Sequence, residues 1–197
     1  MVGFLPAGGI SWRQLSAILR YIPEDHVRAM ATQLSAAGVL NVNDDGIGFS
    51  DEGRRSAQAV INVLPAALHE LWNVDVDRLD ALLSLAQPIA AVATADAMTS
   101  PKVVDAILRP TASTTSFELW HALAKIRRHR ADAHAAAWSH AAHTADSIQR
   151  LGPGPERDAI EQHTNELNSP IWSAIDATDR TRLLAGLAGL NGIGDPT

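Results

Sequence analysis

The chain of 197 residues is long enough for one domain or two small lobes, and its formal net charge of −6 at pH 7 argues against a protein dominated by nucleic-acid binding. It contains no cysteine, which excludes disulfides and thiolate metal sites and fits a cytoplasmic protein. Its apolar residues never form a run of about 18, so the sequence predicts no membrane span.

The first part of the chain predicts helices around a short hairpin. In chain order the expected elements are a helix over 12–20, a helix over 23–37, strands over 39–42 and 47–49, and a helix from 51 towards 72. Ser11 is a good N-cap for the first helix, and Gly38 is a natural stop for the second. Asn43-Asp44-Asp45-Gly46 has the residue types of a hairpin turn. Pro65 is expected to kink or split the last helix, because proline lacks the backbone N–H that a helix interior uses.

The remaining sequence predicts helices throughout. The expected elements are a helix capped by Asp75 or Asp77 that ends at Pro88, a short helix beginning at Ser100-Pro101, a long helix over 116–150, and closing helices over 156–167 and 178–190. The long helix contains neither proline nor glycine and is rich in alanine, which favours one continuous helix. Gly152-Pro153-Gly154-Pro155 turns the backbone after it.

Helix, turn, helix, hairpin and helix follow one another in the order of a winged helix-turn-helix. The segment LSAAGVLNVNDDGIGFSDEGR, residues 34–54, resembles the second helix, the wing and the following helix of MarR-like proteins. The resemblance implies a mainly α fold, in which a winged helix-turn-helix with one small β-hairpin wing is embedded in a larger helical body around the long helix. We place the helix-turn-helix at about 11–38 and the wing at about 39–49, in a lobe over residues 1–90, followed by a helical lobe over 91–197.

A second resemblance lies in the long helix. Leu119-Trp120-His121-Ala122 followed by HRADAH, residues 129–134, resembles a motif of the SalK-like family of actinobacterial helix-turn-helix proteins. Thr164-Asn165-Glu166-Leu167 and the later Pro170-Ile171-Trp172 resemble the closing helix of that family. In the family the histidine motif precedes the winged helix, whereas here it follows it. Either the order is permuted, or the chain carries a degenerate second lobe whose own wing is lost. Function in that family is poorly defined, so the resemblance implies architecture more firmly than activity.

The charges of the expected winged helix have the wrong sign for binding DNA. Between Tyr21 and Gly53 the only Lys or Arg is Arg28, against six acidic residues, and two of these form the wing tip. Phosphate contacts require basic residues, because binding proceeds by displacing counterions from the DNA. If the protein nevertheless binds DNA, the candidate contacts are Arg13, Arg28, Arg54 and Arg55.

The long helix holds five of the eight histidines of the chain. At 100° per residue, one of its faces collects the titratable side chains of His121, Lys125, His129, Asp132, His140 and His143. A separate face is apolar. Such a helix can line a polar pocket, and it can equally present a histidine-rich surface to solvent.

The candidate catalytic residues are His129, Asp132 and His134. His129 and Asp132 are spaced i,i+3, so the carboxylate can orient the imidazole as a general base. His140 and His143 share this spacing and are candidate ligands of a divalent metal. Further ligand-binding residues are expected at His121, Lys125, Arg130, Trp120 and Trp138. Arg130 requires a partner, and the acidic residues available for it are Asp158, Glu161, Glu166 and Asp176.

Together these features predict a winged-helix protein that binds a small molecule in a helical pocket and has lost DNA binding, with acid–base catalysis in specialised metabolism as one form of that function. The alternative is a MarR-like transcriptional regulator that responds to a ligand or metal and binds DNA as a dimer. We expect a homodimer without a membrane association. No cofactor is required, although a divalent metal at the histidines would be compatible with the residue types.

Overall fold

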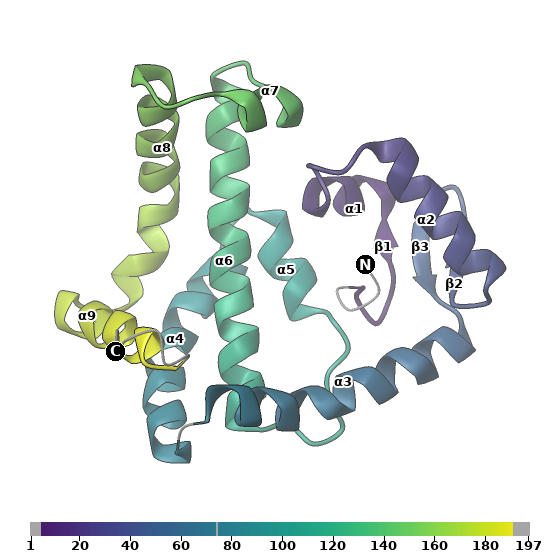
Figure 1. Ribbon diagram of the computed structural model, residues 1–197, viewed down its shortest axis with the longest axis horizontal. Helices are drawn as coiled ribbons and strands as arrows, with labels where there is room; N and C mark the ends of the chain where they lie inside the picture. Colours follow the sequence, from purple (N-terminus) through teal and green to yellow (C-terminus); the bar gives the residue numbers. More distant parts are fainter. Residues whose placement is uncertain (1–4, 74, 191–197) are drawn as a thin grey trace, which may run out of the picture.

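A computed structural model describes residues 5–73 and 75–190, and the fold is mainly helical with one small three-stranded antiparallel sheet (Figure 1). In chain order the elements are β1 (Ile10–Ser11), α1 (Trp12–Ile18), α2 (Glu24–Ala36), β2 (Leu40–Val42), β3 (Gly46–Phe49), α3 (Asp51–Trp72), α4 (Val76–Ala95), α5 (Thr99–Asp105), α6 (Thr115–His140), α7 (Ala145–Arg150), α8 (Pro155–Asn168), the 3-10 helix η2 (Ser169–Ala174) and α9 (Ala177–Ala188). The predicted order of helices and hairpin is confirmed. The two-residue strand β1 was not predicted.

The sheet has the order β1-β3-β2, and α1 and α2 lie between β1 and β2 in the chain. Ile10 pairs with Ile47, and Leu40 pairs with Phe49. The predicted turn chemistry is present, since the Asn43 side chain accepts hydrogen bonds from the backbone N–H groups of residues 45 and 46 at 3.0 and 2.9 Å. Ser11 caps α1 as predicted, in a capping box with Gln14.

The described residues form two main hydrophobic cores. The first belongs to what we call the N-terminal lobe, which is formed by β1–β3, α1, α2 and the start of α3. Val103 of α5 also packs into this core, whose other members are Leu5, Ile10, Leu15, Val27, Ala31, Leu40, Ile47 and Phe49. The second belongs to the helical body, formed by α4, α6, α8, η2 and α9. α4 packs into this second core on both sides of residue 90, for example through Leu82 and Ala93. By packing, all of α4 therefore belongs with the helical body. Figure 1 shows α3 bridging the two parts.

Of the expectations at two prolines, the split considered at Pro65 and the helix end at Pro88 are not found. α3 runs unbroken through Pro65, and α4 runs through Pro88 to Ala95. In α3 the proline is buried in one stripe with Ile61 and Leu68, so packing of this face stabilises the helix across the missing hydrogen bond. Asp75, rather than Asp77, caps α4.

The long helix predicted over 116–150 is wrong in its second part, because α6 ends at His140. The chain then turns through Ala142, whose φ is +60°, and the N–H of His143 donates to the carbonyl oxygen of Trp138 at 2.9 Å. Thr144 begins α7 with a capping box to Ser147. The Thr-x-x-Ser spacing was the sequence signal for this break, since a local cap competes with helix continuation.

α5 also begins one residue earlier than its expected cap. Its N-cap is Met98, and Ser100 lies within the helix. Among the described residues, no single helix is long and apolar enough to cross a membrane. α4 and α5 together have a sufficient length and apolar content, but they are bent by 120° relative to each other.

Candidate functional site

α6 is the central helix of the body and contacts α3, α4, α5 and α8 (Figure 1). Its side chains of His121, His129 and Asp132 are buried, so the expectation of a solvated histidine face does not hold for them. Buried polar groups require hydrogen-bond partners to offset the cost of desolvation. The partners of these three side chains define what the helix can do.

His129 is completely buried, with both ring nitrogens hydrogen-bonded. Its Nδ1 lies 3.0 Å from Oδ1 of Asn168 at the end of α8, and its Nε2 lies 3.0 Å from Oδ2 of Asp96 at the C-cap of α4. The hydrogen bond with His129 is the main influence that lowers the pKa of Asp96. The expected pairing of His129 with Asp132 is therefore wrong, because Asp96 supplies the carboxylate instead.

Asp132 joins the helical body to the N-terminal lobe. It forms an ion pair with Arg20, which follows α1, and it accepts hydrogen bonds from Oγ of Ser100 at 2.7 Å and from its N–H at 2.8 Å. Arg20 also donates from Nη1 to the carbonyl oxygen of Ala131 at 3.2 Å. Both ends of the pair are nearly buried, with side-chain exposures of 13% and 9%. This site ties α1, α5 and α6 together.

His121 faces α5 rather than His129. Its Nε2 lies 2.9 Å from the carbonyl oxygen of Val104, and its Nδ1 lies 3.2 Å from Nη1 of Arg109. Burial is the largest influence on the pKa of His121 and lowers it. Since Arg109 can only donate, His121 is a neutral imidazole that donates from Nε2 and accepts at Nδ1.

Arg109 and Lys125 are occupied by acidic neighbours. Arg109 pairs with Glu118; burial, the largest influence, would raise the pKa of Glu118, but hydrogen bonds from Arg109 and Ser113 lower it overall. Lys125 lies 2.9 Å from Asp105, and its hydrogen bond is the main influence that lowers the pKa of that carboxyl. Lys125 is therefore half-buried in an ion pair with the exposed Asp105.

Arg130 and His134 contact α8. Arg130 donates to Oδ1 of Asn165 at 2.9 Å and to Oε2 of Glu161 at 3.1 Å, so one of the four expected acidic partners is confirmed. His134 places its Nδ1 3.1 Å from Oγ1 of Thr164. Burial is the main influence on the pKa of His134 and lowers it.

The two histidines with lowered pKa values predict a loss of stability in mild acid. The unfolded chain takes up protons on His121 and His134 near the ordinary histidine pKa of 6.5, whereas the folded chain does so only at lower pH. Protonation therefore favours the unfolded state, and the free energy of unfolding falls as the pH drops below 6.5 towards the folded pKa values. Urea unfolding across this window should show a shallower pH dependence for His134→Gln than for the native chain, and identical slopes would contradict the assignment.

His140 and His143 lie on opposite sides of the break after α6, so the i,i+3 spacing does not set them one helical turn apart. The His140 ring is edge-on to His163, with centroids 5.0 Å apart. His143 contacts Ser147 and Glu156, each at 3.1 Å. Across residues 5–73 and 75–190, no three His, Asp or Glu side chains gather as a metal site.

The candidate DNA contacts are largely occupied within the chain. Arg28 bonds Glu24 at 2.9 Å and lies over the Trp12 ring, with its guanidinium carbon 4.4 Å from the centroid. Arg55 pairs with Glu52, and Arg54 donates to the carbonyl oxygen of residue 7 at 2.5 Å. Arg13 is exposed.

An open hollow of about 390 Å³ lies beside the Arg20–Asp132 pair, between the N-terminal lobe and the helical body. Its lining includes Ala17, Arg20, Thr99, Asp132, Ala135 and Trp138. Two expected site residues, Asp132 and Trp138, therefore meet at one hollow, and its volume falls in the range of small-molecule sites. The Trp138 indole is 8% exposed, and its Nε1 is a buried donor with no partner in the described part of the chain. Trp120 lies elsewhere, packed on Phe117 at 5.5 Å between centroids.

Sequence reasoning missed four residues that build this region, namely Arg20, Asp96, Ser100 and Asn168. Each contacts α6 from a distant part of the chain, so no local spacing indicated it. A scan against protein families, a search of curated proteins and a search of solved structures find nothing that matches this chain.

Proposed function

We propose that this chain is a small-molecule-binding protein whose site is the hollow between α1, the start of α5 and α6. The observation that carries the proposal is that Asp132 and Trp138 line the hollow together with residues of the other lobe. Sites between two packed parts of a chain are common places for ligands. A molecule bound there would contact both the N-terminal lobe and the helical body.

The lining favours a neutral, flat ligand. Arg20 and Asp132 neutralise each other, and most of the remaining lining consists of alanine, methionine and indole. An ion placed there would lose its hydration without gaining an unpaired opposite charge. An aromatic or heteroaromatic ring can pack on Trp138, and the Thr99 hydroxyl can hydrogen-bond its edge.

Binding is better supported than acid–base catalysis. A general base must reach the proton that it removes, either directly or through one water. His129 is fully buried, and its two nitrogens already bond Asp96 and Asn168. We therefore assign His129 a positioning role, because Asp96 precedes the Ala97–Thr99 segment that lines the hollow.

We further propose that the N-terminal lobe is a winged helix-turn-helix used as a scaffold. The sheet order β1-β3-β2, with α1 and α2 between β1 and β2 in the chain, supports this assignment. Arg28 is bonded to Glu24, and the wing tip carries Asp44 and Asp45, which disfavours contact with phosphates. A regulator would instead shift DNA fragments in a salt-dependent manner and lose the shift with Arg28→Glu. That result would overturn the scaffold role.

The hollow can be tested with two neighbouring alanines. Ala135 lines it, whereas Ala136 is exposed on the same helix. Neutral fluorinated aromatic fragments, screened by ¹⁹F NMR, should bind the native chain and Ala136→Leu alike. Ala135→Leu fills part of the space and should weaken binding by about tenfold or more. The absence of binding fragments, or equal binding to both variants, would contradict the proposed site.

A further inference from the structure

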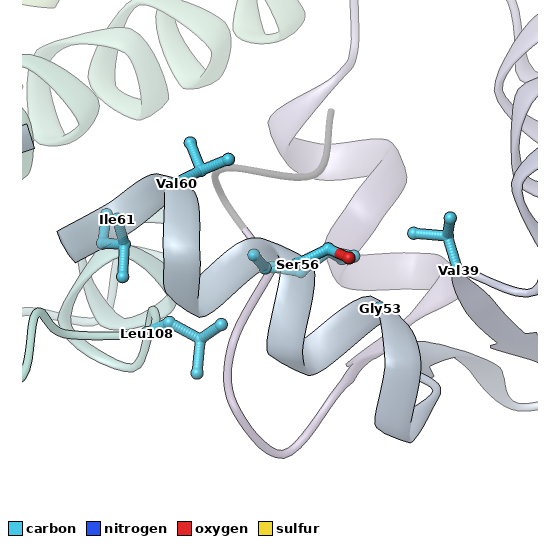
Figure 2. Close-up of a pocket in the computed structure, with 8 residues that line it drawn as sticks. Val39, Gly53, Ser56, Val60, Ile61 and Leu108 are labelled. Atoms are coloured by element: carbon cyan, nitrogen blue, oxygen red, sulfur yellow. The ribbon is translucent and has the colours of Figure 1, made fainter. Parts of the chain in front are cut away.

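A second cavity lies along α3 and is almost entirely apolar (Figure 2). Its volume is about 170 Å³, and its walls include Leu5, Val39, Gly53, Ala57, Ile61 and Leu108. Gly53, Ala57 and Ile61 are spaced by four residues and form one face of α3. Figure 2 shows Val39 and Leu108 approaching this helix from other segments. The cavity shares no lining residue with the hollow beside Asp132.

Two hydrogen bonds to backbone carbonyl oxygens fix the walls of the cavity relative to one another. The N–H of Ala7 donates to the carbonyl oxygen of Ala106 at 3.0 Å, and this joins the segment of Leu5 to the segment of Leu108. The Gln58 side chain donates to the carbonyl oxygen of Arg109 at 2.8 Å, which joins α3 to the same segment. These two hydrogen bonds fix the segments that carry the walls, which limits how far the walls can approach one another.

The end of the cavity near Val39 is equally constrained. The carbonyl oxygen of Val39 comes so close to Gly53 that a Cβ on Gly53 would collide with it. The hydroxyl of Ser50 accepts from the N–H of Gly53 at 2.9 Å, and the N–H of Ser50 donates to the carbonyl oxygen of Val39 at 3.1 Å. The start of α3 is thereby fixed against the segment of Val39, and the cavity lies beside this contact.

We propose that this cavity binds a small, neutral, apolar molecule of about the size of one six-membered ring. A cavity of about 150 Å³ lined by Leu, Ile and Phe in another protein stays dry and binds benzene or xenon. The volume here is similar, at about 170 Å³, and the lining contains no charged side chain, although this pocket is partly open to solvent on the side of Val60, which is 69% exposed. A water molecule needs two to four polar partners, whereas Ser56 is the one side-chain hydrogen-bonding group of this lining. A bound hydrocarbon therefore makes more favourable contacts with the apolar walls than water does.

Benzene and xenon are suitable probes, and two alanines of α3 again provide matched variants. Ala57 lines the cavity, whereas Ala59 is exposed. Benzene should bind the native chain and Ala59→Leu saturably in calorimetry and should raise their Tm values, because a ligand that binds only the folded state stabilises it. In Ala57→Leu the added side chain occupies the space, so affinity should fall by about tenfold or more.

Xenon provides a readout that does not depend on the folding of the variants. Crystals of the native chain under xenon pressure should show a xenon atom between Ala57, Ile61 and Leu108. Absence of benzene binding and of xenon from the native chain would overturn the proposal, as would equal benzene binding to Ala57→Leu and Ala59→Leu. Because the hollow beside Asp132 has a separate lining, failure of either site leaves the other test unaffected.

Discussion

Asp132→Ala is expected to lower the free energy of unfolding by about 3–5 kcal/mol, the usual cost of removing one partner of a buried ion pair. Arg20 would keep its charge at 13% side-chain exposure with no carboxylate beside it. The hydroxyl and the N–H of Ser100, which is 1% exposed, would each lose their acceptor. The variant therefore combines an unpaired charge with two unpaired polar groups at the contact between the two lobes.

Urea unfolding measures this loss, and Glu161→Ala is its matched control. Glu161 pairs with Arg130 at the surface, with side-chain exposures of 38% and 48%, so its removal should cost about 0–1 kcal/mol. If the large effect arises from an unpaired charge, the double variant Arg20→Met with Asp132→Leu should recover most of the lost stability. A loss below about 1 kcal/mol in Asp132→Ala would contradict the role of this pair as a buried connection.

Local sequence signals predicted most of the elements correctly. Ser11 and Asp75 each cap the helix that follows, and Asn43 makes the expected turn. Such signals act within a few residues, so they can be recognised in the sequence without knowledge of the tertiary structure. The helix end expected at Pro88 and the split considered at Pro65 were wrong for the opposite reason. Tertiary packing of an apolar helix face outweighed a local preference at Pro65, and sequence alone does not show what that face contacts.

The candidate site was predictable in its helix and unpredictable in its partners. Spacing correctly grouped His121, His129 and Asp132 on α6, and all three are buried polar residues there. The same spacing suggested that His129 pairs with Asp132, because only neighbours within one helix can be deduced in this way. The true partners, Asp96 and Arg20, lie 33 and 112 residues away from the side chains that they contact. Their acidic or basic character alone could not identify them.

His129→Ala is expected to lower the free energy of unfolding by about 3 kcal/mol or more, since the change removes a fully buried ring and two hydrogen bonds. The vacated space would be enclosed by α4, α6 and α8, which cannot all move inward. The exposed His140 offers a matched control on the same helix, and His140→Ala should have little effect on urea unfolding.

Variants of the two hydrogen-bond partners of His129 separate the contributions to this loss of stability. Asn168→Ala removes one neutral hydrogen-bond partner of His129 and a smaller volume, so it should cost less than His129→Ala. Asp96→Asn retains an oxygen acceptor at a side chain that is 32% exposed, so it should cost least. Where His129→Ala remains folded, Asp96 no longer fixes the segment that lines the hollow, and fragment binding should weaken although His129 itself contacts no ligand. If His129→Ala and His140→Ala lose equal stability and bind fragments equally well, His129 neither supports the core nor positions the site, and the hollow depends on Arg20 and Asp132 alone.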